Sequence, residues 1–109
     1  MAASLVYGLP FKTFDALALA NTTGGTAFAV PIKPGAQGFI WQTSYGTVPS
    51  AISICLQVSV DGTNWTTIDT STTTAGEVRT ILNKLGLYVR GYMTSYTGGT
   101  VGTLTLVYI

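Results

Sequence analysis

Apolar and polar side chains alternate along most of the chain, and the alternation is clearest over residues 52–60. Every second position there is aliphatic, and the positions between them are polar apart from Cys55. The aliphatic positions are Ile52, Ile54, Leu56, Val58 and Val60. Because the side chains of a strand point alternately to its two faces, this period of two predicts a strand with one buried face.

The rest of the chain also has the composition of short strands and turns. Threonine is abundant and glycine occurs 13 times, which favours strands joined by glycine-containing turns. Besides residues 52–60, strands are expected over residues 11–20, 27–33, 38–44, 65–69, 78–82, 87–94 and 101–109.

The first of these segments, residues 11–20, alternates only weakly. Leu17 and Leu19 share a face with Asp15, and the alanines also suit a short helix. No crossover helices are predicted between the strands, so the fold is expected to be all-β and antiparallel, a sandwich or a barrel of about eight strands. A chain of this length has room for one such domain, residues 1–109.

A hairpin is predicted directly after the strand at residues 52–60. Asp61-Gly62 follows the alternating run, and this dipeptide is a strong turn signal. Gly62 can adopt the positive φ that such a turn requires. Trp65 opens the return strand, where its ring is expected to cover one end of the core. We therefore interpret Asp61, Gly62 and Trp65 as residues that determine the fold.

This hairpin also carries a resemblance to known proteins. The pattern Ser-x-Asp-Gly-x-x-Trp of residues 59–65 resembles the central hairpin of discoidin-like, galactose-binding-type jelly rolls. Leu-Tyr-Val-Arg at residues 87–90 and Thr-Ser-Tyr-Thr-Gly-Gly-Thr-Val at residues 94–101 resemble the C-terminal segment of that architecture. The combination is also similar to short phage virion proteins, and it covers residues 52–109.

The resemblance implies a jelly-roll-like β-sandwich and a virion component that is made in the host cytoplasm. No basic segment followed by an apolar core begins the chain, so no export signal is expected. Discoidin-type domains are longer, usually exported and often closed by a disulfide. Their ligand-binding loops match no residues of this chain, so sugar binding is not carried over from them.

Charged residues make up only 8% of the chain, against roughly 25% in an ordinary soluble domain. A surface with so few charges is poorly protected against association, so we expect much of it to be covered by partners, including further copies of the chain. The net charge of +1 provides no basic surface for nucleic acid. No apolar run approaches the length of about 20 residues that spans a bilayer, so no membrane partner is expected.

Catalytic and metal-binding residue types are scarce. The sequence contains no histidine, which excludes Ser-His-Asp and Cys-His arrangements. The single cysteine, Cys55, excludes an internal disulfide and is expected to be a packed apolar side chain. Asp61 and Asp69 flank the hairpin, where aspartate commonly caps backbone amides. We expect no enzyme, no cofactor and no metal site.

Two segments are candidate partner contacts. Residues 1–11 contain an apolar run, which is either an arm that orders on a partner or the first strand of the core. Pro31 interrupts residues 27–33 and indicates an edge strand, because proline cannot donate a ladder hydrogen bond. The candidate contact residues are Leu5, Val6, Tyr7, Leu9, Phe11 and Pro31.

Three functions fit these observations. The first is a non-enzymatic capsid decoration or cement protein that binds the major capsid protein or other virion proteins as a homo-oligomer. The second is a tail or fibre module that binds carbohydrate through aromatic side chains, and the third is a ring-forming tail or head-completion component. An exposed row of aromatic residues would favour the second; a buried Trp65 with an exposed aliphatic patch would favour the first. The available aromatic residues are Trp41, Tyr45, Trp65, Tyr88, Tyr92 and Tyr96.

Overall fold

The computed structural model describes residues 3–31 and 33–109, and within these ranges it contains ten strands and no helix. The strands are β1 (Ala3–Ser4), β2 (Pro10–Ala18), β3 (Thr23–Gly24), β4 (Phe28–Ala29), β5 (Gly38–Tyr45), β6 (Ala51–Ser59), β7 (Thr66–Ser71), β8 (Val78–Leu82), β9 (Tyr88–Thr97) and β10 (Val101–Tyr108). Each expected strand is present, but the one expected over residues 27–33 is reduced to β4, and position 32 lies outside the described residues. The two-residue strands β1 and β3 were not expected.

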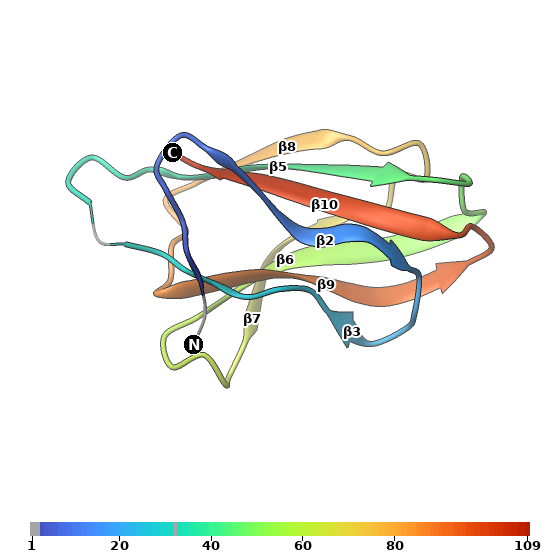
Figure 1. Ribbon diagram of the computed structural model, residues 1–109, viewed down its shortest axis with the longest axis horizontal. Helices are drawn as coiled ribbons and strands as arrows, with labels where there is room; N and C mark the ends of the chain where they lie inside the picture. Colours follow the sequence, from blue (N-terminus) through green and yellow to red (C-terminus); the bar gives the residue numbers. More distant parts are fainter. Residues whose placement is uncertain (1–2, 32) are drawn as a thin grey trace.

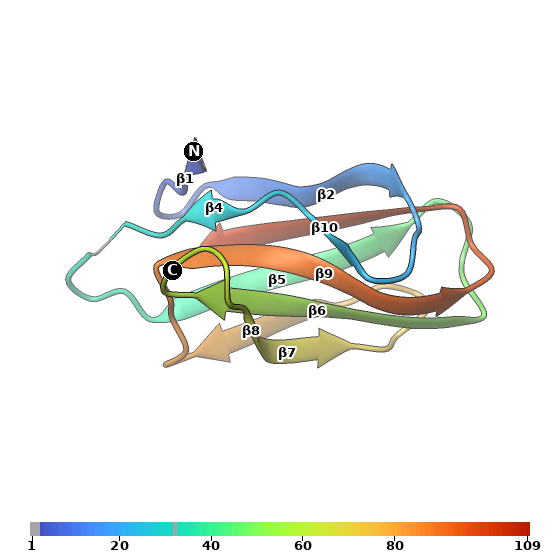
Figure 2. The ribbon, with the colours of Figure 1, turned by 90° about the horizontal axis from the view of Figure 1, so that it is seen from below.

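The strands form two sheets that pack face to face, as Figures 1 and 2 show. One sheet has the order β1-β4-β9-β6-β7, with β3 also paired to β9, and the other has the order β2-β10-β5-β8. Every pairing is antiparallel except that of β1 with β4, which is parallel. The predicted all-β sandwich is therefore confirmed, and the described strands do not close into a barrel.

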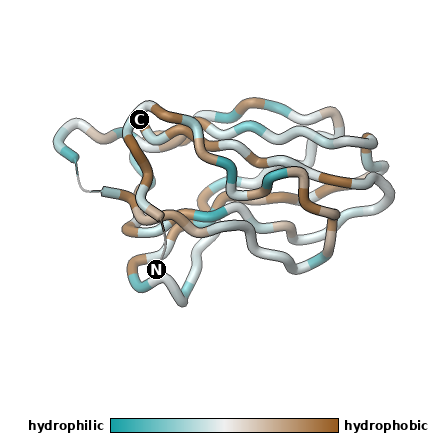
Figure 3. The backbone as a smooth tube through the Cα atoms, in the orientation of Figure 1, coloured by the Kyte–Doolittle hydropathy of each residue, from teal (hydrophilic) through white to brown (hydrophobic). Residues whose placement is uncertain are grey.

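The core lies between the two sheets and is built from alternate residues of their central strands. In β10 every second residue from Gly102 to Tyr108 is buried, as the period of two requires. The side chains that are most completely buried include Phe39, Trp41, Ile54, Leu56, Val89, Met93, Leu104, Leu106 and Tyr108. Figure 3 shows the corresponding apolar positions at intervals along the strands.

The strand β6 matches its predicted alternation over most of its length. Ile52, Ile54 and Leu56 are buried in the core. Cys55 is also buried, on the opposite face, with its sulfur 3.6 Å from the hydroxyl oxygen of Thr67. Val60 departs from the expectation, because β6 ends at Ser59 and the Val60 side chain is 74% exposed.

The strand β2 is irregular, in keeping with its weak alternation. The register between β2 and β10 shifts near Leu104, and Ala16 has a φ of 53°, so the strict alternation of faces is lost. Two consecutive residues, Thr13 and Phe14, are buried, whereas Leu17 is 45% exposed. The helical alternative for this segment does not occur.

Candidate functional site

The first described residues are part of the sandwich and do not form a free arm. Leu5 is only 2% exposed and belongs to the core, and its amide donates a hydrogen bond to the carbonyl of Ala29 at 2.8 Å. Phe11 is half-buried against the core, with its ring centroid 5.2 Å from that of Phe28. Leu5 is therefore enclosed by the core, whereas Phe11 is only partly covered by it. Residues 1–2 of the expected arm lie outside the described residues.

The remaining candidate contacts are exposed and lie close to Tyr108. Val6, Tyr7 and Leu9 are 52%, 45% and 52% exposed. The Tyr7 ring packs edge-on against that of Tyr108, with a centroid distance of 5.5 Å. Pro31 is exposed, and its carbonyl accepts a hydrogen bond of 2.7 Å from the Tyr108 hydroxyl. The structure thus brings the two predicted contact segments together at one end of the sandwich.

This end also carries exposed apolar side chains from segments that sequence reasoning did not select. They come from the loop after β6, from the end of β8 and from the loop that follows it. We call the whole surface the apolar end; its members are Val6, Tyr7, Leu9, Val60, Leu82, Leu85 and Leu87. Leu85, a leucine outside the predicted strands, was the available signal.

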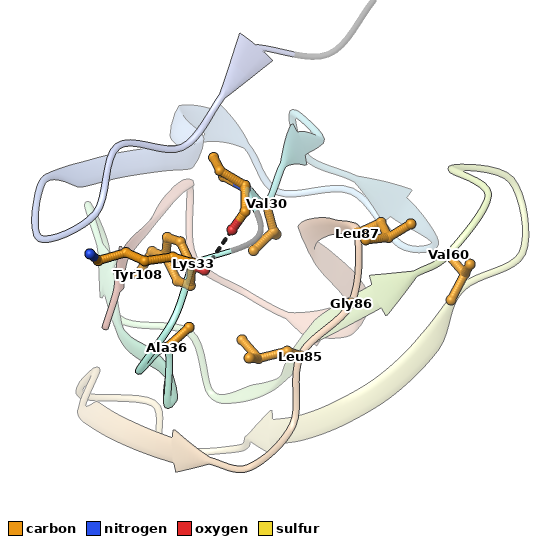
Figure 4. Close-up of a pocket in the computed structure, with 9 residues that line it drawn as sticks. Val30, Lys33, Ala36, Val60, Leu85, Gly86, Leu87 and Tyr108 are labelled. Carbon is orange, nitrogen blue, oxygen red and sulfur yellow. Dashed lines mark hydrogen bonds between the residues drawn. The ribbon is translucent and has the colours of Figure 1, made fainter.

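An open pocket of about 370 Å³ lies within the apolar end (Figure 4). Val30, Ala36, Leu85 and Leu87 surround it, and Tyr108 forms another wall. Further lining residues are Pro31, Lys33, Val60 and Gly86. Such a concave apolar surface suits an apolar group of a partner.

The polar groups around this pocket are already engaged. The ammonium group of Lys33 lies 4.6 Å from the centroid of the Tyr7 ring and points away from the pocket in Figure 4. The Tyr108 hydroxyl donates to Pro31, and burial raises the pKa of Tyr108, so it stays a neutral donor. The pocket therefore presents apolar surface and no reactive group.

The predicted hairpin joins β6 to β7, and its loop is organised by Asp61. One carboxylate oxygen of Asp61 accepts hydrogen bonds from the amides of Thr63 and Asn64, each at 2.8 Å, and from the Ser59 hydroxyl at 2.9 Å. These bonds favour the charged form and hold the pKa of Asp61 well below its usual range. Gly62 has a φ of 79°, as the turn requires.

Asp69 has a separate structural role. Its carboxylate accepts two hydrogen bonds from Arg79, at 2.7 and 2.9 Å, and one of 2.9 Å from the indole nitrogen of Trp41. Desolvation is the largest single influence on the pKa of Asp69 and raises it, but these hydrogen bonds and the Arg79 charge together lower it. Because β7 and β8 belong to different sheets, this ion pair joins two sheet edges.

Trp65 does not cover the core, which corrects the expectation from the sequence. Trp41 is the buried tryptophan, with an exposed fraction of 1%. Trp65 is half-buried outside the core, and its ring centroid lies 4.4 Å from the guanidinium carbon of Arg90. The same guanidinium lies 5.0 Å from the centroid of the Tyr92 ring. We call Gln57, Trp65, Arg90 and Tyr92 the aromatic–arginine face.

Within residues 3–31 and 33–109, no group of three or more Cys, Asp or Glu side chains is placed to hold a metal ion. Over the same residues, the structure contains no helix long and apolar enough to cross a membrane.

Comparison with known proteins gives one structural likeness. No protein-family model and no curated protein matches the sequence. The fold is similar to that in the crystal structure of SPBc2 prophage-derived protein YomS, which aligns over 97% of this chain and 100% of that chain. The TM-score is 0.52 and the sequence identity is 15%, so the likeness concerns the fold.

Proposed function

We propose that this chain is a non-enzymatic structural protein of a phage virion, and more narrowly a capsid decoration protein that stabilises the shell. Its partners would be the major capsid protein or other virion proteins, together with further copies of the chain. The observation that carries the proposal is the apolar end, where the exposed side chains of Val60, Leu85 and Leu87 line an open apolar pocket.

Two further observations support this proposal. An exposed apolar patch beside a pocket is typical of a protein–protein contact surface. Few charges oppose association, since only 8% of the residues are charged. The solved protein with a similar fold is prophage-derived, which agrees with a phage origin for this chain.

The test is co-sedimentation of the purified chain with heads and tails of the phage from which its gene has been deleted. The wild-type chain is expected to sediment with heads. Val60→Glu should abolish this, because Val60 is 74% exposed at the apolar end and a carboxylate there would have to be desolvated on binding. Val48→Glu is the matched control: Val48 is 63% exposed in the loop after β5, at the opposite end.

The outcomes separate the alternatives. Binding to tails alone would support the alternative function, a ring-forming tail or head-completion component. Binding to neither particle would contradict a virion role. If Val60→Glu binds heads as well as Val48→Glu does, the apolar end is not the contact surface. Light scattering of the free chain measures whether it is a homo-oligomer.

A second candidate function, a carbohydrate-binding module of a tail or fibre, is favoured by a different observation. Trp65 and Tyr92 are half-exposed on one sheet face and flank the same guanidinium group. Accessible aromatic rings can pack against the apolar faces of sugar rings. This surface is separate from the apolar end, so the two functions can be tested independently.

A further inference from the structure

We propose that the aromatic–arginine face binds a sugar that carries a carboxylate, and that Arg90 binds this carboxylate. The proposal rests on the second candidate function, carbohydrate binding, and names the class of sugar. It is carried by the environment of Arg90, whose partners are two aromatic rings and a neutral amide.

The charge of Arg90 is not balanced by an acidic side chain, in contrast to that of Arg79. Arg79 donates to Asp69 and to Glu77 at 2.7 to 2.9 Å. Within residues 3–31 and 33–109, no carboxylate lies within 4.0 Å of Arg90, and neither of its terminal nitrogens has a hydrogen-bond acceptor. Arg90 therefore retains the donors with which a guanidinium binds a carboxylate in two parallel hydrogen bonds.

The guanidinium group is also held in a defined position. Its Nε–H donates to the side-chain oxygen of Gln57 at 2.9 Å, and the amide nitrogen of Gln57 donates to Thr67 at 3.3 Å. The rings of Trp65 and Tyr92 restrict it further. An arginine fixed in this way loses little conformational entropy when a ligand binds.

The neighbouring strand β3 leaves room for this arrangement. A Cβ atom at Gly24 would lie 2.9 Å from a terminal nitrogen of Arg90, so any larger residue would displace the guanidinium. The φ of Gly24 lies outside the positive range, so its backbone conformation does not require glycine. The glycine is therefore explained by the space that Arg90 occupies.

The chemistry of the ligand follows from these contacts. The half-exposed rings of Trp65 and Tyr92 would contact the apolar face of a sugar, and Arg90 would bind an acidic substituent. A neutral sugar would gain only the ring contacts. A nucleic acid is disfavoured because the net charge of +1 cannot neutralise a row of phosphates.

The experiment measures binding of galacturonic, glucuronic and N-acetylneuraminic acid oligosaccharides by chemical-shift titration, with galactose and glucose oligosaccharides as neutral counterparts. At least one acidic sugar is expected to bind at millimolar concentration, about 10-fold more tightly than its neutral counterpart, since charged hydrogen bonds add that much affinity. Arg90→Gln should remove this difference. Gly24→Ala should weaken acidic-sugar binding, whereas Lys84→Gln, which removes a charge elsewhere, should not.

Each other outcome overturns a stated part of the argument. Equal binding of acidic and neutral sugars, unaffected by Arg90→Gln, would contradict the role of Arg90 but keep carbohydrate binding. Binding of no sugar would contradict both. Tighter binding of a thymidine oligonucleotide than of any acidic sugar would assign the face to single-stranded nucleic acid. Thermal melting of each variant checks that it is folded.

Discussion

At the scale of single residues, the two tryptophans have opposite roles. Trp41 is completely enclosed by the core, and its indole nitrogen donates to Asp69. That carboxylate is bound in turn by Arg79 from the other sheet edge. Trp41 therefore supports both the core and the ion pair, whereas Trp65 contacts Arg90 outside the core.

We predict that Trp41→Ala and Trp65→Ala differ strongly in stability. Trp41→Ala should lower the free energy of unfolding by about 3 to 5 kcal/mol, because it opens a large cavity. Trp65→Ala should lower it by about 1 kcal/mol, the contribution of an exposed cation–π contact. Urea denaturation of both variants measures the difference, and an equal or larger loss for Trp65→Ala would contradict these assigned roles.

The spacing of Trp65 and Ile68 in the sequence already indicates that Trp65 points outward. Trp65 shares its face with Thr67, which accepts a hydrogen bond from Gln57 on the outer face. The aliphatic residue of this strand, Ile68, packs against the core instead. Ile68 lies three positions after Trp65, so the two side chains point to opposite faces, and burying Ile68 places Trp65 outside. The size of a ring alone therefore does not predict its burial. Arg90 was missed because Trp65, one of its two aromatic neighbours, is distant in sequence and meets it only in the fold.

At the scale of elements, local pattern predicted the long strands and failed for the short ones. β8 occupies the expected residues 78–82, and β6 the expected run within one residue at each end. β1 and β3 have two residues each, and their pairing depends on Phe28 and Met93, which are distant in sequence. Such pairings leave no periodic signal, because two residues cannot establish a period.

The β6–β7 hairpin makes stability sensitive to acid through Asp61. Its pKa is lowered in the folded state relative to the ordinary value of 3.8, so the stabilising contribution is fully present above that value. It is lost as the pH falls through the folded pKa, because the unfolded chain then binds the proton more readily. The free energy of unfolding should therefore decrease below about pH 4.

The variant Asp61→Asn should reduce this acid sensitivity. Asparagine still accepts hydrogen bonds from turn amides but does not titrate. Part of the sensitivity should remain, because the pKa values of Asp69 and Glu77 are also lowered. Urea denaturation between about pH 7 and about pH 2 measures the slope. An unchanged slope in Asp61→Asn would show that the loop contributes nothing to acid unfolding.

At the scale of the whole molecule, side-chain contacts join the two sheets along both sides of the sandwich. Asp69 and Arg79 connect β7 to β8. On the other side, the amide of Gly91 in β9 donates to the Thr13 hydroxyl oxygen in β2 at 3.0 Å, and Thr26 donates to the carbonyl of Thr13 at 2.7 Å. These connections hold the two sheets together. The sequence predicted only the N-terminal part of the apolar end, since Leu82, Leu85 and Leu87 join it through the topology.

The close approach of β2 and β9 depends on the absence of a side chain at Gly91. A Cβ atom there would collide with the Thr13 hydroxyl and would lie 2.7 Å from a methyl carbon of Leu104. Both neighbours are buried, so neither can move without disturbing the core. The two sheets would have to separate locally to accept even one methyl group.

We therefore predict that Gly91→Ala lowers the free energy of unfolding by about 2 to 3 kcal/mol, the cost of overpacking a close-packed core. Gly24→Ala is the matched control, because its added methyl group meets only the Arg90 side chain, which lies outside the core, and should cost less than about 1 kcal/mol. Thermal and urea unfolding of the two variants measure both effects. Equal stability of the two variants would mean that the packing at Gly91 does not limit how closely the two sheets approach.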